Sequence, residues 1–167
     1  MRTSPSTSAD GEGLNAGTLY RRLAPQVLGY LRSQRVPEAE DVLGEVFVQV
    51  ARDLKGFKGD DDACRRWVFS IAHNRMVDAF RRENRRRDEP GEVPEVAVHD
   101  DLDGVDPALA AALDGLTPDQ REVVVLRFVA DLSIEAVAKV TRRRVGAVKA
   151  LQHRALKNLE QAVSPEG

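Results

Sequence analysis

The chain has 167 residues, 31% of them charged, and its net charge of −2 does not by itself indicate a nucleic-acid ligand. The single cysteine excludes an internal disulfide, and three scattered histidines provide no zinc-ligand spacing, so we expect no metal, no cofactor and a reducing, cytoplasmic compartment. No apolar run approaches the roughly 20 residues that span a bilayer, so we expect no membrane insertion.

Two helices are predicted after an N-terminal tail. Residues 1–13 are rich in Ser, Thr and Gly and lack the apolar block of a signal peptide, which indicates a disordered tail. Over 14–35 apolar side chains return at helical intervals until Pro37 interrupts the pattern. Over 39–54 they follow the i, i+3, i+4, i+7 series for four turns, which predicts a second amphipathic helix.

The opposite side of this second helix carries an acidic stripe with one apolar residue. It consists of Asp41, Glu45 and Val48. Such a stripe suits a protein partner better than DNA, because its charge has the same sign as the phosphates. A plain solvated face is the alternative interpretation.

A glycine-containing loop and a basic helix come next. Residues 55–60 place Phe57 and Lys58 between two glycines, which indicates a loop. A helix is predicted over 63–87, and from residue 65 onward it carries eight arginines against two acids. Basic side chains complement the dipole at a helix C-terminus, but this excess is greater than capping requires, so phosphate binding is the more economical interpretation.

The following span is acidic and rich in Pro and Gly. Between residues 88 and 106 there are eight acids and no Lys or Arg. This composition is typical of a flexible linker. We therefore expect two small domains, over 14–88 and 108–163, joined by a linker over 89–107.

Residues 116–159 are typical of a helix-turn-helix. Segment 117–120 offers a capping residue, a proline at the first helical position and a Gln that can close a capping box. Ser133 caps the next helix, and a basic turn over 141–144 precedes a helix with one apolar face and one basic, amide-bearing face. The basic face suits the major groove of DNA, where bases offer acceptors to Arg and Lys. An ordinary helical hairpin with a solvated basic face is the alternative.

In this order the segments resemble the extracytoplasmic-function (ECF) sigma factors of the sigma-70 family. The segments similar to the sigma-2 domain are 39–47, 57–60, 67–74 and 78–82. The segments similar to the sigma-4 domain are 116–118, 132–133, 145–149 and 153–156. The resemblance implies an all-α protein with a sigma-2-like helical bundle and a sigma-4-like helix-turn-helix domain, joined by the acidic linker.

The resemblance also implies partners and contact residues. In this family the sigma-2 domain binds the clamp helices of the largest subunit of core RNA polymerase and captures the separated −10 promoter strand, while sigma-4 binds the polymerase flap and reads the −35 element. An anti-sigma factor is a further implied partner, and no catalytic activity is implied.

The resemblance also implies which residues make these contacts. The implied polymerase contacts are Asp41, Glu45, Val48 and Gln49. The implied −10 contacts are Phe57, Lys58, Trp67, Asn74, Arg81, Arg82 and Arg85. The implied −35 contacts are Arg142, Arg143, Arg144, Lys149, Gln152 and Arg154.

For some of these residues a purely structural role is the alternative. Phe57 and Asn74 match positions that frame a flipped-out base, since single-stranded bases stack on aromatic rings. Alternatively, Phe57 pins its loop to the core, Asn74 caps a turn, and Trp67 is a core residue. The turn departs from the family pattern, because Arg142 stands where many members carry Gly and Arg144 stands where many carry a small capping residue.

Two other functions remain open. A stand-alone helix-turn-helix regulator would bind duplex DNA tightly without polymerase. An enzyme would use Asp60, Asp61 and Asp62 as a metal site, but consecutive residues do not converge on one ion without further ligands.

Overall fold

The computed structural model describes residues 14–88 and 106–164, and all regular structure in these ranges is helical. The predicted all-α class is confirmed, whereas the predicted N-terminal tail and most of the linker lie outside the described residues. The helices of the N-terminal half are α2 (Ala16–Ser33), α3 (Ala39–Asp53), the 3-10 turn η1 (Leu54–Gly56) and α4 (Asp61–Asp88). Those of the C-terminal half are α5 (Pro107–Asp114), α6 (Pro118–Val124), the π-helical turn η2 (Val125–Val129), α7 (Ile134–Thr141) and α8 (Val145–Val163).

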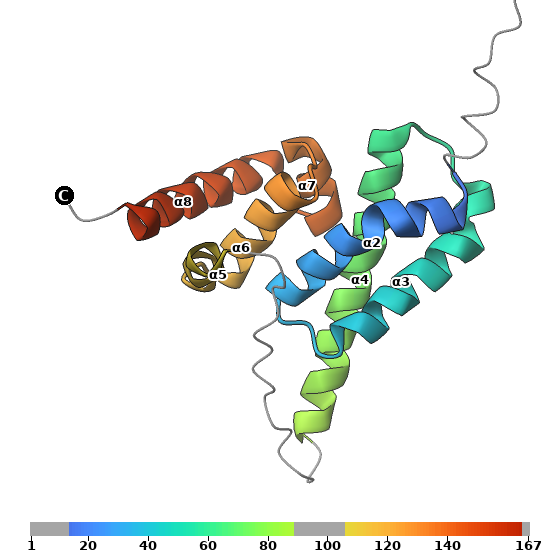
Figure 1. Ribbon diagram of the computed structural model, residues 1–167, viewed down its shortest axis with the longest axis horizontal. Helices are drawn as coiled ribbons and strands as arrows, with labels where there is room; N and C mark the ends of the chain where they lie inside the picture. The colour runs from blue at the N-terminus through green and yellow to red at the C-terminus, as the bar shows by residue number, and fades with distance from the viewer. Residues whose placement is uncertain (1–13, 89–105, 165–167) are drawn as a thin grey trace, which may run out of the picture.

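The N-terminal half is a bundle in which α3 packs against both α2 and α4 (Figure 1). Asn15 begins α2, because its side chain accepts a hydrogen bond of 2.7 Å from the amide of Gly17. The rings of Tyr30 and Phe69 are fully buried and meet edge to face, 5.9 Å between centroids. Burying an apolar side chain of this size contributes about 1.5–3 kcal/mol.

The C-terminal half contains the predicted helix-turn-helix. The capping box is confirmed, since Thr117 Oγ1 accepts from the Gln120 amide and Gln120 Oε1 accepts from the Thr117 amide. Ser133 caps α7 as predicted, through a 3.1 Å bond from the Ala136 amide. Helix α5 was not predicted. It begins where Asp106, counted in the sequence with the acidic linker, caps the helix through the amide of Ala108.

The two halves pack against each other and share one hydrophobic core. In Figure 1, α6 and α7 lie against α2 and α4, and the contacts include α4 with α7 and α2 with both α6 and η2. Leu126 and Val137 are fully buried in the same cluster as Val27 and Val68 of the N-terminal half. The sequence predicted two domains joined by a linker, but it did not predict that they pack against each other.

Candidate nucleic-acid interface

The acidic stripe of α3 is partly committed to contacts within the N-terminal half. Val48 is 60% exposed, and Asp41 is exposed as well. Glu45 lies 3.5 Å from the guanidinium of Arg82, and Gln49 Oε1 accepts two hydrogen bonds from Arg75, of 2.9 and 3.1 Å. Glu45 and Gln49 therefore connect α3 to α4, whereas Asp41 and Val48 present their side chains to solvent.

The loop before α4 is held by an aromatic stack. The rings of Phe57 and Trp67 lie 4.8 Å apart at an interplanar angle of 19°, and both side chains pack on the core. A Cβ built at Gly59 would lie 2.8 Å from Ala63 Cβ and 3.1 Å from Phe57 Cζ, so the loop needs glycine there. In this conformation Phe57 pins the loop to α4, and Lys58 beside it is exposed.

The aspartates at the start of α4 are used locally. Asp60 Oδ1 accepts a 2.8 Å hydrogen bond from the Ala63 amide, which is the geometry of an N-terminal cap. Within the described ranges, no three His, Cys, Asp or Glu side chains gather as candidate metal ligands.

The C-terminal turns of α4 present a basic surface. Arg81 and Arg85 are exposed, and Arg81 is only loosely paired with Asp78 at 3.9 Å. Asn74 is also exposed, and its Oδ1 lies 3.5 Å from Nη2 of Arg142, which belongs to the turn of the C-terminal half. The structure thus brings a predicted −10 residue and a predicted −35 residue together.

The basic turn places its arginines in three different environments. Arg142 ends α7 in the left-handed conformation with φ 57°, which costs a residue other than glycine about 1–2 kcal/mol. Arg143 turns inward and forms a 2.7 Å ion pair with Asp119. Arg144 is the N-cap of α8, is exposed and makes no capping bond through its side chain. Its charge stands at the positive end of the helix dipole, where an anion would be favoured.

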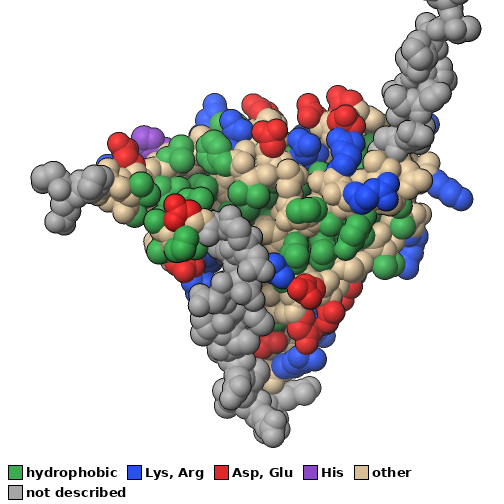
Figure 2. Space-filling view, in the orientation of Figure 1, with side chains coloured by type: hydrophobic (Ala, Val, Ile, Leu, Met, Phe, Trp, Pro, Cys, Tyr) green, Lys and Arg blue, Asp and Glu red, His purple; other side chains and the backbone are tan. Residues whose placement is uncertain are grey.

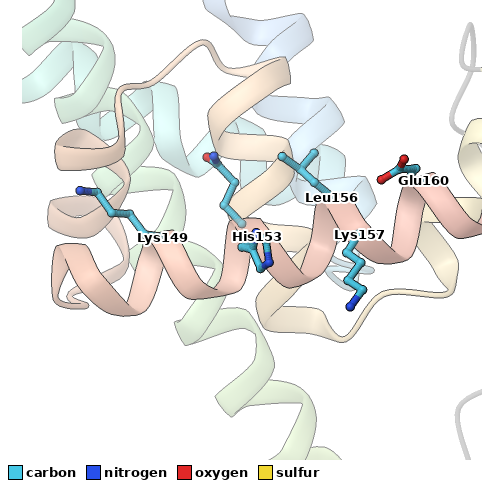
Figure 3. A pocket seen from close by; sticks show the side chains of 6 residues that line it. Lys149, His153, Leu156, Lys157 and Glu160 are labelled. Carbon is cyan, nitrogen blue, oxygen red and sulfur yellow. The ribbon is translucent and has the colours of Figure 1, made fainter.

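Helix α8 carries a shallow groove along its exposed side, with a volume of about 470 Å³ (Figure 3). The lining residues are Lys149, Gln152, His153, Leu156, Lys157 and Glu160. Lys149 and Gln152 were predicted from the sequence, whereas His153 and Lys157 were missed. The i, i+4 spacing of Lys149, His153 and Lys157 could have indicated that they share one face. Arg154 is exposed on the same helix.

An apolar patch covers another part of the C-terminal half. Figure 2 shows hydrophobic side chains gathered over α5, α6 and α8, at the left of the view. Leu109 of α5 and Val163 of α8 are exposed, and a small buried cluster that includes Leu113, Val124 and Ala155 joins α5, α6 and α8. Exposed apolar patches of this kind mark protein-binding surfaces.

Titratable side chains also lie buried between the two halves. His73 Nδ1 on α4 lies 3.2 Å from a carboxylate oxygen of Glu122 on α6 and 3.3 Å from the hydroxyl of Tyr30. Burial raises the pKa of Tyr30 well above its usual value, the negative charge of Glu122 raises it further, and Arg143 lowers it in part. Burial lowers the pKa of Arg121, and the neighbouring charge of Arg35 adds to this effect. Sequence patterns gave no signal for this group.

Comparison with known proteins agrees with this architecture. The family model described as Sigma-70 region 2 matches residues 19–86, and that described as Sigma-70, region 4 matches residues 107–159. These matches define a sigma factor of the sigma-70 type, a class of transcription initiation factors rather than enzymes.

Individual relatives define the branch of the family. The chain is 33% identical to the ECF RNA polymerase sigma factor SigX of Bacillus subtilis, over 74% of this chain and 70% of SigX. It is 32% identical to BldN of Streptomyces coelicolor, over 89% of this chain and 60% of BldN, so it spans about 60% of the length of that relative. The chain belongs to the extracytoplasmic-function sigma factors.

Two solved structures share the fold. CnrH in complex with the cytosolic domain of CnrY matches with a TM-score of 0.60 and 27% identity, over 89% of each chain. RpoE of Bartonella quintana in complex with the anti-sigma factor NepR matches with a TM-score of 0.70 and 22% identity, over 86% of this chain and 93% of RpoE. None of the helices in the described ranges is both long and apolar enough to cross a membrane.

Proposed function

We propose that the chain is a promoter-specificity subunit of RNA polymerase that itself has no catalytic activity and acts in the bacterial cytoplasm. Residues 14–88 would bind polymerase and the −10 element, and residues 108–163 would bind the −35 element. The observation that carries the proposal is the presence of both sigma-70 regions, in order, in one chain whose α8 exposes a basic face.

For the −35 element, we assign base reading to Lys149 and Gln152, which line the exposed groove of α8. In the major groove Lys can donate to the acceptors of guanine, and the Gln amide can accept from N6 and donate to N7 of adenine. Arg144 and Arg154 are assigned to phosphates, because a phosphate at the start of α8 would be the anion that the helix dipole favours.

For the −10 element, we assign Phe57, Trp67 and Asn74 to the captured base. A base could stack on the aromatic pair, and an Asn amide can bond an exposed base edge. The exposed basic side chains near this site would hold the phosphates, which fits the excess of arginine on α4. These phosphate contacts are Lys58, Arg81, Arg82 and Arg85.

For polymerase, we assign the exposed Asp41 and Val48 as the direct contacts on the clamp helices. Glu45 and Gln49 would contribute at the edge of the same surface, since α4 already engages them. The apolar patch on α5 and α8 is the candidate site for the flap. An anti-sigma factor would compete for these surfaces, and the complexes of RpoE with NepR and of CnrH with CnrY support such a partner.

Duplex binding with and without polymerase tests the proposal against the stand-alone regulator. The full chain should bind a −35 duplex weakly by itself and selectively once core polymerase is added. Tight, sequence-selective binding by the chain alone, unchanged by core polymerase, would favour the regulator instead.

A further inference from the structure

One side of α3 is engaged by arginines of α4. Gln49 Oε1 accepts two hydrogen bonds from Arg75, one of 3.1 Å from Nε and one of 2.9 Å from Nη2. Glu45, one turn earlier on the same side of α3, lies 3.5 Å from Arg82. The Glu45 side chain is 39% exposed, but its Oε1 faces Arg82 and its Oε2 is buried. The acceptor atoms of both α3 side chains therefore face α4 or the protein interior.

The two arginines form a row beside the strip of α4 that we assign to the −10 strand. Arg75 and Arg82 are nearly two turns apart, so they lie on the same side of the helix. Arg75 directly follows Asn74, and the residue before Arg82 is Arg81. Both preceding residues are exposed and assigned to the −10 element, and one step along an α-helix is a rotation of about 100°. The row therefore lies between this strip and α3.

The two arginines differ in the charge of their partners. Arg82 is paired with a carboxylate, which offsets its charge. Arg75 is partly exposed and is held by a neutral amide, and among the described residues no carboxylate lies within ion-pair distance of it. Gln49 therefore fixes the guanidinium of Arg75 without neutralising it. A guanidinium held in this way is suited to charge-assisted hydrogen bonds with phosphate oxygens.

We propose that Arg75 is a further contact to a phosphate of the captured −10 strand and that Gln49 is the residue that positions it. Gln49 then serves the promoter surface in place of an edge contact to polymerase. A phosphate is favoured over a carboxylate of polymerase, because the row adjoins the basic turns of α4. The inference rests on the proposed function, since it requires that the N-terminal half holds the −10 strand.

The test measures two affinities for each full-length variant. One is the affinity of the chain for core polymerase. The other is the affinity of the holoenzyme for a fluorescent single-stranded oligonucleotide that carries the −10 sequence of a promoter it transcribes, measured at several salt concentrations. Arg75→Gln should weaken oligonucleotide binding about tenfold and lower the slope of log affinity against log salt concentration by about 0.7, the value for one phosphate on a single strand.

The Gln49 variants separate positioning from a merely structural role. Gln49→Glu keeps both acceptor bonds but pairs Arg75 with a negative charge, so it should reproduce the losses of Arg75→Gln. A structural residue would be unaffected, because the new ion pair still connects α3 to α4. Gln49→Ala should lower the affinity less and keep the parent slope, because the charge of Arg75 remains and only its position is lost. Gln49→Glu combined with Arg75→Gln should lose no more than Arg75→Gln alone.

Affinity for core polymerase should stay at the parent value in all these variants. Gln161→Glu is the matched control, because it adds the same charge at an exposed position of α8 and should change neither affinity. If Arg75→Gln loses helicity by circular dichroism, Gln49→Glu decides.

Parent-like oligonucleotide affinity and salt slope in folded Arg75→Gln or Gln49→Glu would overturn the proposal. Weaker binding of Gln49→Glu to core polymerase, with unchanged oligonucleotide binding, would also overturn it and return Gln49 to the polymerase contact. A parent holoenzyme that transcribes no promoter would instead contradict the proposed function.

Discussion

Replacing Gly59 by Ala should break the aromatic stack that holds the −10 loop. Gly59 has φ 156°, which residues with a side chain rarely adopt, and its added Cβ would lie 2.8 Å from Ala63 Cβ and 3.1 Å from Phe57 Cζ. Backbone strain of this kind costs about 1–3 kcal/mol and overpacking a similar amount. Because the two are relieved by the same movement of the loop, we expect a loss of about 2–3 kcal/mol in unfolding free energy.

The assay follows from the composition, since Trp67 is the only tryptophan and stacks on Phe57. Emission of folded Gly59→Ala should shift to the red as Trp67 becomes exposed to water, and urea unfolding should give the loss of stability. Permanganate reactivity of −10 thymines in the holoenzyme should fall. Gly56→Ala is the control, because its Cβ would meet no atom within 4 Å. Equal emission, stability and promoter melting for both variants would refute the reasoning.

Three further outcomes are expected. Asp41→Lys should weaken binding to core polymerase without loss of helicity, since its side chain is exposed on α3, and unchanged affinity would remove Asp41 from the contact. Lys149→Ala should reduce base discrimination at particular −35 positions by about 1–3 kcal/mol. Arg144→Ala should instead weaken binding to all −35 sequences alike and lower the slope of log affinity against log salt concentration by about one. Identical profiles for the two variants, measured with a −35 library at two salt concentrations, would contradict these roles. Because the folded-state pKa of Tyr30 is raised, its stabilising contribution is complete below its unfolded pKa of about 10 and is lost as pH rises above it. The loss of stability at alkaline pH should accordingly be shallower in Tyr30→Phe than in the parent, and equal pH profiles for the two proteins would refute the effect.

Local rules explain what could be predicted from the sequence. Thr117 and Ser133 signal helix starts because a capping side chain bonds an amide within three residues along the chain. Helix α5 was missed for a related reason: its cap, Asp106, follows a run of acids and was counted with the linker. The left-handed turn at Arg142 was recognised as unusual only through the family resemblance, since a local pattern of three arginines does not specify its backbone angles.

The contact between the halves could not be predicted in this way. Gln34 and Glu122 are 88 residues apart, and helical periodicity shows that a face is apolar without showing which face covers it. Arg143 is a second case of a contact between distant residues, here within the C-terminal half. The sequence indicated a contact to the −35 element, whereas in the structure the side chain is paired with Asp119, 24 residues earlier in the chain.

Transcription from a genomic library by core polymerase, with and without the chain, tests the central claim most directly. Adding the chain should produce new transcripts whose start sites share one −35 and one −10 sequence. Lys149→Ala should disturb the −35 preference, and Asn74→Ala should disturb the −10 preference. Transcripts that are the same with and without the chain, from core polymerase shown to bind it, would contradict the assignment.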